Sequence, residues 1–222
     1  MRLPQIDQHP PDSTVAESVL DQLADALVSE GYAVVDDLFD PLLIQSLRTE
    51  FDRPDCQFKT AGIGRDQAFT VARDIRGDRI CWLEGQSLAA TRFLGIMGQI
   101  QIGLNQRLFM GLFDYESHLA FYPVGTFYKK HLDAFKGRSN RVLSTVLYLN
   151  TQWDCYAGGE LVLYTRADDA VLQRVVPLAG RLVVFLSEDF PHEVLPATRE
   201  RYSIAGWFRV NTNTAGVVDP PE

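Results

Sequence analysis

The sequence Y-P-V-G-T-F-Y-K-K-H-L-D runs from Tyr122 to Asp133 and ends in a His-x-Asp pair formed by His131 and Asp133. On a β-strand, side chains two residues apart point to the same face of the sheet. An imidazole and a carboxylate that lie side by side can occupy two adjacent positions on one metal ion. The best candidate for a third ligand is His192, in the sequence F-P-H-E-V. Two histidines and one carboxylate form the facial triad of non-haem Fe(II) sites, which leaves metal positions open for other ligands.

The composition is typical of a globular domain, with 46% apolar and 23% charged residues in a chain of 222. The formal net charge of −8 disfavours nucleic-acid backbones and anionic membranes as partners. The chain contains no run of about 18 apolar residues, and its N-terminus lacks the apolar stretch of a signal peptide. We therefore expect a cytoplasmic protein that binds neither nucleic acid nor membrane.

The three cysteines, Cys56, Cys81 and Cys155, are widely spaced and odd in number. They form neither a recognisable disulfide framework nor a C-x-x-C zinc motif. The expectation is three reduced thiols in a cytoplasmic protein.

The N-terminal half is predicted to be mainly helical. Residues 1–13 are rich in proline and predict a mobile arm. Thr14 and Glu17 form a capping-box pattern that begins a helix, and Gly31 is expected to end it. Residues 32–38 have the pattern of a strand.

A second short helix is predicted where Asp40 precedes a proline, and it extends to about residue 50. Residues 52–79 lack periodicity, which is typical of a functional loop or a disordered segment. A long helix is predicted over residues 88–108, with an apolar stripe that would pack on a sheet.

The C-terminal half is predicted to consist of about eight short strands separated by turn residues. Short strands at regular spacing are typical of a sandwich or jelly roll. The predicted fold class is α+β, mainly β, with a double-stranded β-helix (cupin-like jelly roll) core at 117–211, helical support at 14–112, and a single domain at 14–222. The predicted strands are 118–124, 127–133, 142–149, 160–164, 172–176, 181–186, 192–195 and 202–210.

Arg201 lies nine residues after His192, at the start of the last predicted strand. A guanidinium beside a buried strand face needs an anion, and it is suited to a bidentate grip on a carboxylate. The alternative is a surface pair with Glu200 or Glu193. Tyr148 is a second possible donor to the same anion, although a core tyrosine bonded to water fits equally well. Fe(II) together with a bound dicarboxylate indicates 2-oxoglutarate as a co-substrate.

The other two histidines are weaker candidates for the site. His9 lies in the predicted arm, and His118 begins a predicted strand, where a structural histidine with satisfied hydrogen bonds is the more common case.

Several segments resemble the 2-oxoglutarate/Fe(II)-dependent prolyl 4-hydroxylases. They are more similar to the oxygen-sensing, HIF-type animal enzymes and their bacterial relatives than to the collagen-modifying enzymes. The segment D-I-R-G-D-R-I-C-W-L-E-G is more specific to this family than the iron triad is, because many unrelated oxygenases share the triad. The segments are 74–85, 122–133, 147–154, 158–161 and 191–207.

This resemblance implies that His131, Asp133 and His192 bind Fe(II). It implies that Arg201 binds the distal carboxylate of 2-oxoglutarate with help from Tyr148. Arg201 and the three iron ligands together would form the catalytic set. It also implies an oxidoreductase that converts 2-oxoglutarate and O2 into succinate and CO2 while hydroxylating C4 of a prolyl residue.

Further expectations follow from the same resemblance. Tyr122 and Trp207 would line the pocket beside iron and co-substrate, and the segment before residue 74 would close over the substrate. L-Ascorbic acid is a possible reductant. The expected partner is a cytosolic protein with a proline in a flexible segment, and elongation factor Tu is one candidate.

Three alternatives remain open at this stage. The chain could be a 2-oxoglutarate oxygenase that acts on another side chain or on a free amino acid. It could be a non-catalytic, cupin-like iron-binding sensor. A nucleic-acid demethylase on the same fold is disfavoured by the acidic composition.

Overall fold

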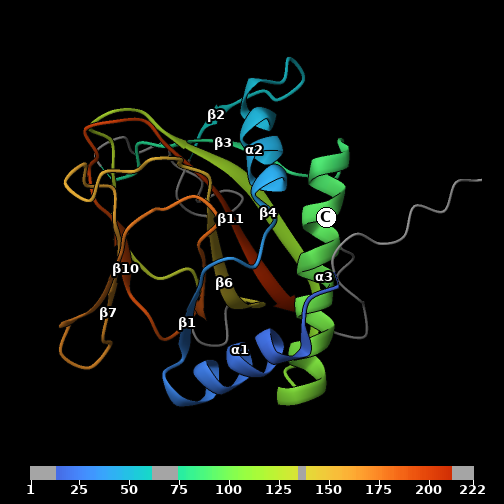
Figure 1. The fold of residues 1–222 in the computed structure, drawn as a ribbon. Helices are drawn as coiled ribbons and strands as arrows, with labels where there is room; N and C mark the ends of the chain where they lie inside the picture. Colours follow the sequence, from blue (N-terminus) through green and yellow to red (C-terminus); the bar gives the residue numbers. More distant parts are fainter. Residues whose placement is uncertain (1–13, 62–74, 135–138, 212–222) are drawn as a thin grey trace, which may run out of the picture.

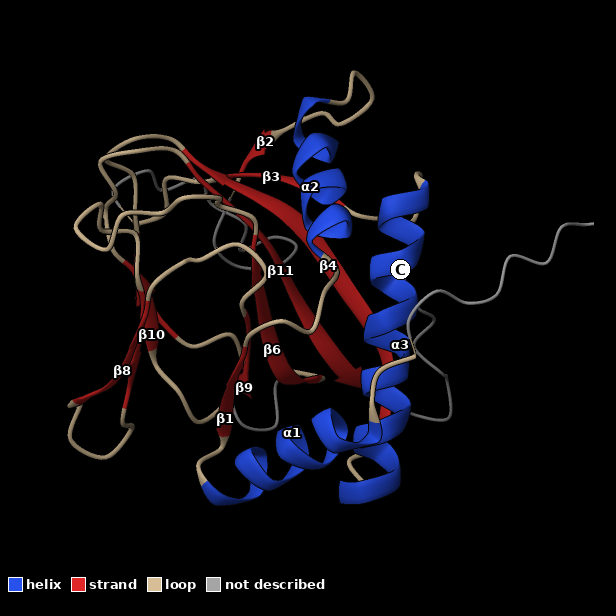
Figure 2. Ribbon diagram, viewed as in Figure 1, coloured by secondary structure: helices blue, strands red, loops and turns tan. Residues whose placement is uncertain are grey.

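The computed structural model describes residues 14–61, 75–134 and 139–211, so the predicted arm at 1–13 lies outside the described residues. Two antiparallel sheets face each other, and three helices lie against the outer face of the larger sheet (Figures 1 and 2). The larger sheet has the strand order β1-β9-β6-β11-β4-β3-β2, and the smaller has the order β5-β10-β7-β8. The mainly β, jelly-roll prediction is confirmed.

The elements, in chain order, have the following bounds. They are α1 (Glu17–Ser29), β1 (Tyr32–Val35), α2 (Pro41–Thr49), the 3₁₀ helix η1 (Glu50–Asp52), β2 (Lys59–Thr60), β3 (Arg79–Trp82), α3 (Leu88–Leu108), β4 (Leu112–Tyr122), β5 (Tyr128–His131), β6 (Arg141–Tyr148), β7 (Leu161–Tyr164), β8 (Val171–Val175), β9 (Leu182–Leu186), β10 (His192–Val194) and β11 (Arg201–Val210).

The first helix begins differently from the prediction. Its N-cap is Ala16, which makes no side-chain capping bond, so the predicted capping box of Thr14 and Glu17 is wrong. The backbone N–H of Val15 instead donates to the side chain of Gln99 at 2.8 Å. A side chain of α3 therefore takes the place of a local cap at this end of α1.

The other helix boundaries follow the sequence closely. Asp40 caps α2 by accepting from the N–H of Leu42 at 2.8 Å, as predicted. Ser87 caps α3 and also donates to buried Glu50 at 2.7 Å, which ties α3 to the segment that follows α2. The predicted helix over residues 88–108 is confirmed, because α3 covers the same range.

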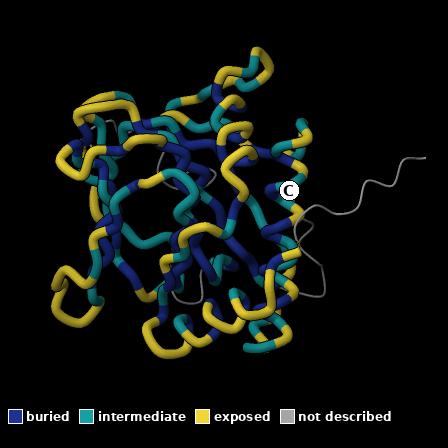
Figure 3. The backbone as a smooth tube through the Cα atoms, viewed as in Figure 1, coloured by how far each residue is buried: buried dark blue, intermediate teal, exposed yellow. Residues whose placement is uncertain are grey.

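The hydrophobic core has two main parts. One lies between the helices and the larger sheet and includes Phe93, Met97 and Ile100 from the predicted stripe of α3. The other lies between the two sheets, where Tyr122 and Tyr148 are buried. Buried backbone is concentrated along the strands, and many connecting loops are exposed (Figure 3). The interior between the sheets is where the candidate site lies.

Some strand boundaries differ from the predictions. β4 begins at Leu112, six residues before the predicted strand, and β3 falls in a segment with no predicted strand. β1 ends at Val35 because the backbone turns at Asp37, whose φ is 61°. The remaining seven predicted strands of the C-terminal half are found, with each end within two residues of its predicted position.

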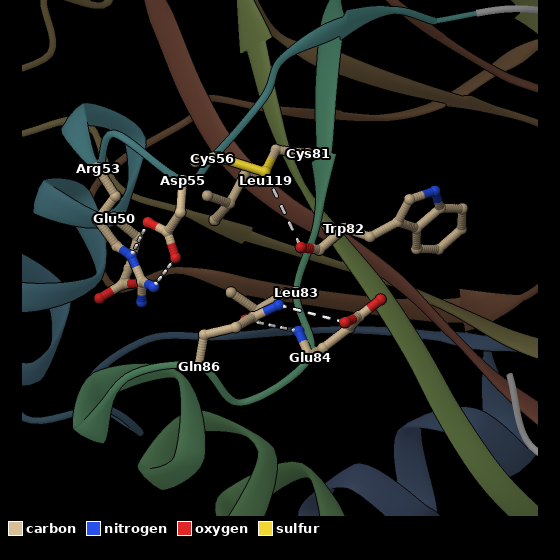
Figure 4. Close-up of a pocket in the computed structure, with 10 residues that line it drawn as sticks. All are labelled: Glu50, Arg53, Asp55, Cys56, Cys81, Trp82, Leu83, Glu84, Gln86 and Leu119. Carbon is tan, nitrogen blue, oxygen red and sulfur yellow. Dashed lines mark hydrogen bonds and ion pairs between the residues drawn. A yellow bond between two sulfur atoms is a disulfide. The ribbon is translucent and has the colours of Figure 1, made fainter.

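The prediction of three reduced thiols is wrong. Cys56 and Cys81 form a disulfide with their Cα atoms 5.9 Å apart (Figure 4). Cys155 is free and exposed. The bond joins the segment after η1 to β3. Because β3 was not predicted, nothing in the sequence indicated that these two cysteines are neighbours.

The longest described helix, α3, carries too many polar residues to cross a bilayer, and none of the other helices in the described ranges could do so.

Candidate metal centre and anion pocket

Three ligating side chains meet between the ends of two paired strands. His131 ends β5, His192 begins β10, and the two residues are direct partners in the antiparallel register. Asp133 lies two residues beyond the end of β5. The prediction that it lies on the same strand as His131 is therefore wrong. One ligand atom from each of the three residues lies within 4.8 Å of the others. The sheet register therefore brings together residues far apart in the sequence.

Both imidazoles present the same nitrogen to the carboxylate. Nε2 of His131 and Nε2 of His192 each lie 3.6 Å from an oxygen of Asp133. The opposite nitrogens, Nδ1, contact the carbonyls of Lys129 at 2.8 Å and Phe190 at 3.0 Å. A carbonyl can only accept a hydrogen bond, so the proton lies on Nδ1 and the Nε2 lone pair is available to a metal.

The protonation states also suit metal binding. Burial, with His131 nearby, lowers the pKa of His192 to about 4, so its imidazole is neutral near neutral pH. Burial would raise the pKa of Asp133, but the neighbouring histidines and a hydrogen bond from Ser144 hold that pKa well below its usual value. Two imidazoles and one carboxylate are a donor set that fits Fe(II) with open positions.

A layer of neighbouring side chains holds these ligands in place. The hydroxyl of Ser144 donates to Oδ2 of Asp133 at 2.6 Å, and its oxygen lies 2.9 Å from the hydroxyl of Ser187. The ring of Tyr128 stacks on His131 with the centroids 3.6 Å apart. Sequence reasoning missed Ser144 and Ser187, because only the pairing of β6 with β9 shows that they are neighbours.

The second part of the site is a cationic pocket centred on Arg201. Only 1% of this residue is exposed, and its guanidinium donates to the carbonyl of Gly159 at 2.9 Å and to Ser203 at 3.1 Å. It lies 4.9 Å from the ring centroid of Tyr122 and 5.0 Å from that of Tyr148. Across the described ranges, no acidic side chain forms an ion pair with Arg201. Its positive charge is therefore available to a bound anion.

Tyr148 supports the same conclusion. Its hydroxyl is buried and lacks a hydrogen-bond partner among the described residues. Burial raises the pKa of this hydroxyl, so it stays protonated and can donate. The alternative of a surface pair for Arg201 is wrong, because Glu200 accepts from Tyr202 and Glu193 accepts from Tyr164.

The two remaining candidates line the same interior. Tyr122 pairs with Arg201 in the register of β4 and β11, and it is 6% exposed. Trp207 pairs with Ser144 in the register of β11 and β6, so it lies beside the residue that bonds to Asp133. The guanidinium of Arg141 packs over the Trp207 ring at 3.6 Å from its centroid. The seven residues that the sequence predicted for the site therefore all line the same interior between the two sheets.

Comparison with known proteins agrees with this geometry. Residues 117–209 match the family described as the 2OG-Fe(II) oxygenase superfamily. The chain is 41% identical to a prolyl-4-hydroxylase from Pseudomonas putida, with a TM-score of 0.78, and the match covers 86% of this chain and 99% of that one. The chain belongs to the 2OG-Fe(II) oxygenase superfamily. The cofactor and co-substrates of that family, Fe(II), 2-oxoglutarate and O2, are those expected from the sequence.

This oxygenase also has animal relatives. It is 29% identical over 198 residues to Egl nine homolog 1 of Rattus norvegicus, covering 85% of this chain and 58% of that protein. The chain spans about half the length of this protein and of its mouse and human counterparts. A prolyl hydroxylase from Trichoplax adhaerens, solved with a hypoxia-inducible-factor peptide fragment, has the same fold at 24% identity and a TM-score of 0.77.

Proposed function

We propose that this oxygenase hydroxylates C4 of a prolyl residue in a protein and converts 2-oxoglutarate and O2 into succinate and CO2. The observation that carries the proposal is the match to the Pseudomonas putida prolyl-4-hydroxylase, which extends over 99% of that chain at 41% identity. The described residues supply what such a reaction needs: a donor set for Fe(II) and a buried cation for a dicarboxylate.

In this proposal the metal is held by His131, Asp133 and His192. Bound Fe(II), with 2-oxoglutarate, supplies the activation of O2 that the protein side chains cannot provide themselves. The chain's own contribution begins with the two Nδ1 hydrogen bonds, which orient the imidazoles. The neighbouring histidines, with the bond from Ser144, hold the pKa of Asp133 below its usual value, and the Ser144 bond fixes the rotamer of the carboxylate.

Arg201 and Tyr148 are proposed to bind the distal carboxylate of 2-oxoglutarate. A guanidinium and a hydroxyl can share the oxygens of one carboxylate, and burial strengthens such charge-assisted bonds. Tyr122 and Trp207 would exclude water from the space between this carboxylate and the metal. We further propose that residues 14–222 act as one oxygenase domain, and that ascorbate keeps the metal reduced.

The proposed substrate is a protein that presents a proline in a flexible segment. The Trichoplax adhaerens relative was solved with a peptide fragment of a protein, which supports this class of substrate. Elongation factor Tu in the cytoplasm is a candidate that we propose for a first test.

The test is an assay of purified enzyme with Fe(II), 2-oxoglutarate and ascorbate, with and without elongation factor Tu or a cell extract. We expect substrate-dependent succinate and a hydroxyl group on a specific proline, located by mass spectrometry. The matched control, Asp133→Ala, should give neither product. Oxygen added only to other side chains or to free amino acids would contradict prolyl hydroxylation. Iron binding without any succinate would indicate a non-catalytic sensor.

A further inference from the structure

The disulfide between Cys56 and Cys81 forms part of the wall of a half-open pocket with a volume of about 100 Å³ (Figure 4). This pocket lies on the helix side of the larger sheet, because Cys81 pairs with Leu119 in the register of β3 and β4. Leu119 and Tyr122 are three residues apart on β4, so they point to opposite faces of the sheet. Both cysteines are half-buried, and a small thiol can therefore reach the bond from solvent.

The surroundings of the bond make its cysteines poor nucleophiles once they are reduced. Three carboxylates and one guanidinium line the pocket, those of Glu50, Asp55, Glu84 and Arg53. Arg53 donates to Glu50 at 2.9 Å and to Asp55 at 2.9 Å, so its charge is already paired. A cysteine becomes a reactive thiolate mainly beside uncompensated positive charge. The pair therefore fits a site that external thiols oxidise and reduce, and not one that catalyses exchange on other proteins.

On one side, the bond holds the segment that contains β2. This strand consists of Lys59 and Thr60, and it pairs with β3 over only these two residues. Cys56 comes three residues before β2, and its bond to Cys81 spans a sequence separation of 25 residues. A cross-link of this kind limits the conformational freedom of the loop that it closes. The position of β2 therefore depends on the covalent bond as well as on a short pairing.

β2 leads directly to a buried ion pair. The N–H of Ala61 donates to the carbonyl of Asp78 at 3.1 Å. The side chain of Asp78 is fully buried and accepts from Nε of Arg76 at 2.6 Å. Gly77, which lies between them, donates its N–H to the carbonyl of Phe127 at 2.9 Å. A shift of the β2 segment therefore acts on the backbone that positions Arg76.

Arg76 contacts the aromatic ring that supports a metal ligand. Arg76 and Tyr128 form an isolated antiparallel bridge, and the guanidinium lies 4.6 Å from the centroid of the Tyr128 ring. The same ring stacks on the imidazole of His131, with the centroids 3.6 Å apart. A continuous series of contacts thus connects the disulfide with the orientation of His131. Such a series is a route for energetic coupling, and the coupling itself is measurable.

We propose that Cys56 and Cys81 form a reversible redox site that regulates the metal centre. In the disulfide form the β2 segment is fixed, and Arg76 holds Tyr128 against His131. In the dithiol form the segment is released, and the imidazole is held less firmly. The proposed function places this enzyme in the cytoplasm, where a disulfide is usually transient and redox-sensing. That assignment of compartment rests on the proposed function, whereas the site itself does not.

The reductant is a dithiol. Its first thiolate attacks one sulfur of the bond, forms a mixed disulfide and releases the other cysteine as a thiolate. Its second thiolate then attacks the reductant's own sulfur in the mixed disulfide, so the reductant leaves as a cyclic disulfide and the second cysteine is released. Two electrons pass to the cysteines, and the two protons lost by the dithiol end on the cysteine sulfurs.

The first measurement is thiol labelling of the folded protein. A maleimide label is counted by mass spectrometry before and after incubation with dithiothreitol, an uncharged dithiol, without denaturant. We expect one labelled cysteine, Cys155, before reduction, and all three cysteines of the chain after it. Oxidised glutathione should restore the disulfide. A purely structural bond resists reduction as long as the protein stays folded.

The second measurement is amide hydrogen exchange without metal or substrate. It compares the oxidised wild type with Cys56→Ser/Cys81→Ser, and the reduced wild type serves as a second sample without the bond. The amides of Ala61 and Gly77 should exchange about tenfold or more faster without the cross-link, because it restricts opening of the loop that contains them. The amides of β8, at the edge of the smaller sheet, should exchange at the same rate in all samples.

The third measurement is anaerobic Fe(II) titration. The double cysteine variant should bind Fe(II) about three- to tenfold more weakly than the oxidised wild type, less than the roughly ten- to hundredfold effect of removing a partner of a ligand. In an Arg76→Gln background, loss of the disulfide should change the Fe(II) affinity no further, because the series of contacts is already broken. Cys155→Ser is the matched control and should behave as the wild type.

Three results would overturn the inference. One is labelling of Cys56 and Cys81 only after the protein unfolds. Another is equal exchange of the Ala61 and Gly77 amides with and without the bond. The third is an Fe(II) affinity that does not depend on the bond, or that depends on it equally when Arg76 is replaced. None of these measurements uses a protein substrate, so they test the redox site even if prolyl hydroxylation is refuted.

Discussion

The hydroxyl of Ser144 lies 2.6 Å from Oδ2 of Asp133 and joins this carboxylate to the hydroxyl of Ser187. Both serines are almost fully buried, so neither bond competes with water. The carboxylate proposed to bind iron is thus oriented from the larger sheet, whereas the two histidines come from the smaller one. The metal centre depends on the spacing between the sheets.

The first prediction concerns this bond. Ser144→Ala should weaken Fe(II) affinity by about ten- to a hundredfold, the usual effect of losing a residue that orients a metal ligand. Ser144→Thr, which keeps the hydroxyl, should retain most of the affinity. Anaerobic Fe(II) titration measures both. Equal affinities in wild type and Ser144→Ala would show that Asp133 needs no such support.

The second prediction concerns the anion pocket. Arg201→Lys should raise the dissociation constant for 2-oxoglutarate by more than about tenfold, because an ammonium cannot reproduce the bidentate fork of a guanidinium. Tyr148→Phe should raise it by about five- to tenfold, as expected for one hydrogen bond. Both variants should bind Fe(II) as the wild type does. A loss of iron binding in either variant would contradict the separation of the two sites.

The third prediction concerns the disulfide. Cys56 and Cys81 are 25 residues apart, and a cross-link over a loop of that size stabilises a protein by about 3 kcal/mol. Cys81→Ser should lower the unfolding free energy by that order under oxidising conditions, and a thiol reductant should remove the difference. Cys155→Ser is the control, because that thiol is exposed and unpaired. Urea unfolding with and without reductant measures the effect, and identical curves would mean that the bond contributes nothing.

The fourth prediction concerns acid stability. The pKa of His118 is lowered by burial and by the nearby cations of Arg76 and Arg141, against the opposing charge of Asp78, to about 4 from 6.5. Between these values the unfolded chain binds a proton that the folded chain does not, so stability falls as the pH falls. The loss is at most about 1.4 kcal/mol per pH unit.

His118→Phe should therefore lose less stability than the wild type between about pH 7 and about pH 5. Part of the pH dependence should remain, because His192 has a similarly lowered pKa. Urea unfolding at the two pH values provides the comparison. Parallel losses in both proteins would contradict a buried, neutral His118.

The sequence predicted the parts of the site that depend on local pattern. The pair His131 and Asp133 is visible from its spacing, and the strand that begins with Arg201 is visible from its apolar alternation. The register of β5 and β10 brings His192 opposite His131, as the triad requires. Here residue type and spacing indicate the arrangement that is found, although Asp133 lies beyond the end of β5 and not on the strand.

The sequence did not predict features that depend on which strands become neighbours. Ser144, Ser187 and the partner of Cys81 have no local signal, because their roles arise from pairing between distant segments. His118 is a related case. A buried histidine usually has its hydrogen bonds satisfied, and only the atomic positions show that none of the described residues does this for Nδ1 of His118.

The most direct test of the central claim is an anaerobic titration of Fe(II) and 2-oxoglutarate into the protein, followed by visible absorption. We expect a metal-to-ligand charge-transfer band in the wild type, no band in Asp133→Ala, and a band in Arg201→Lys only at a much higher concentration of 2-oxoglutarate. A wild-type protein without the band, or an Asp133→Ala variant that retains it, would contradict the assignment of this site.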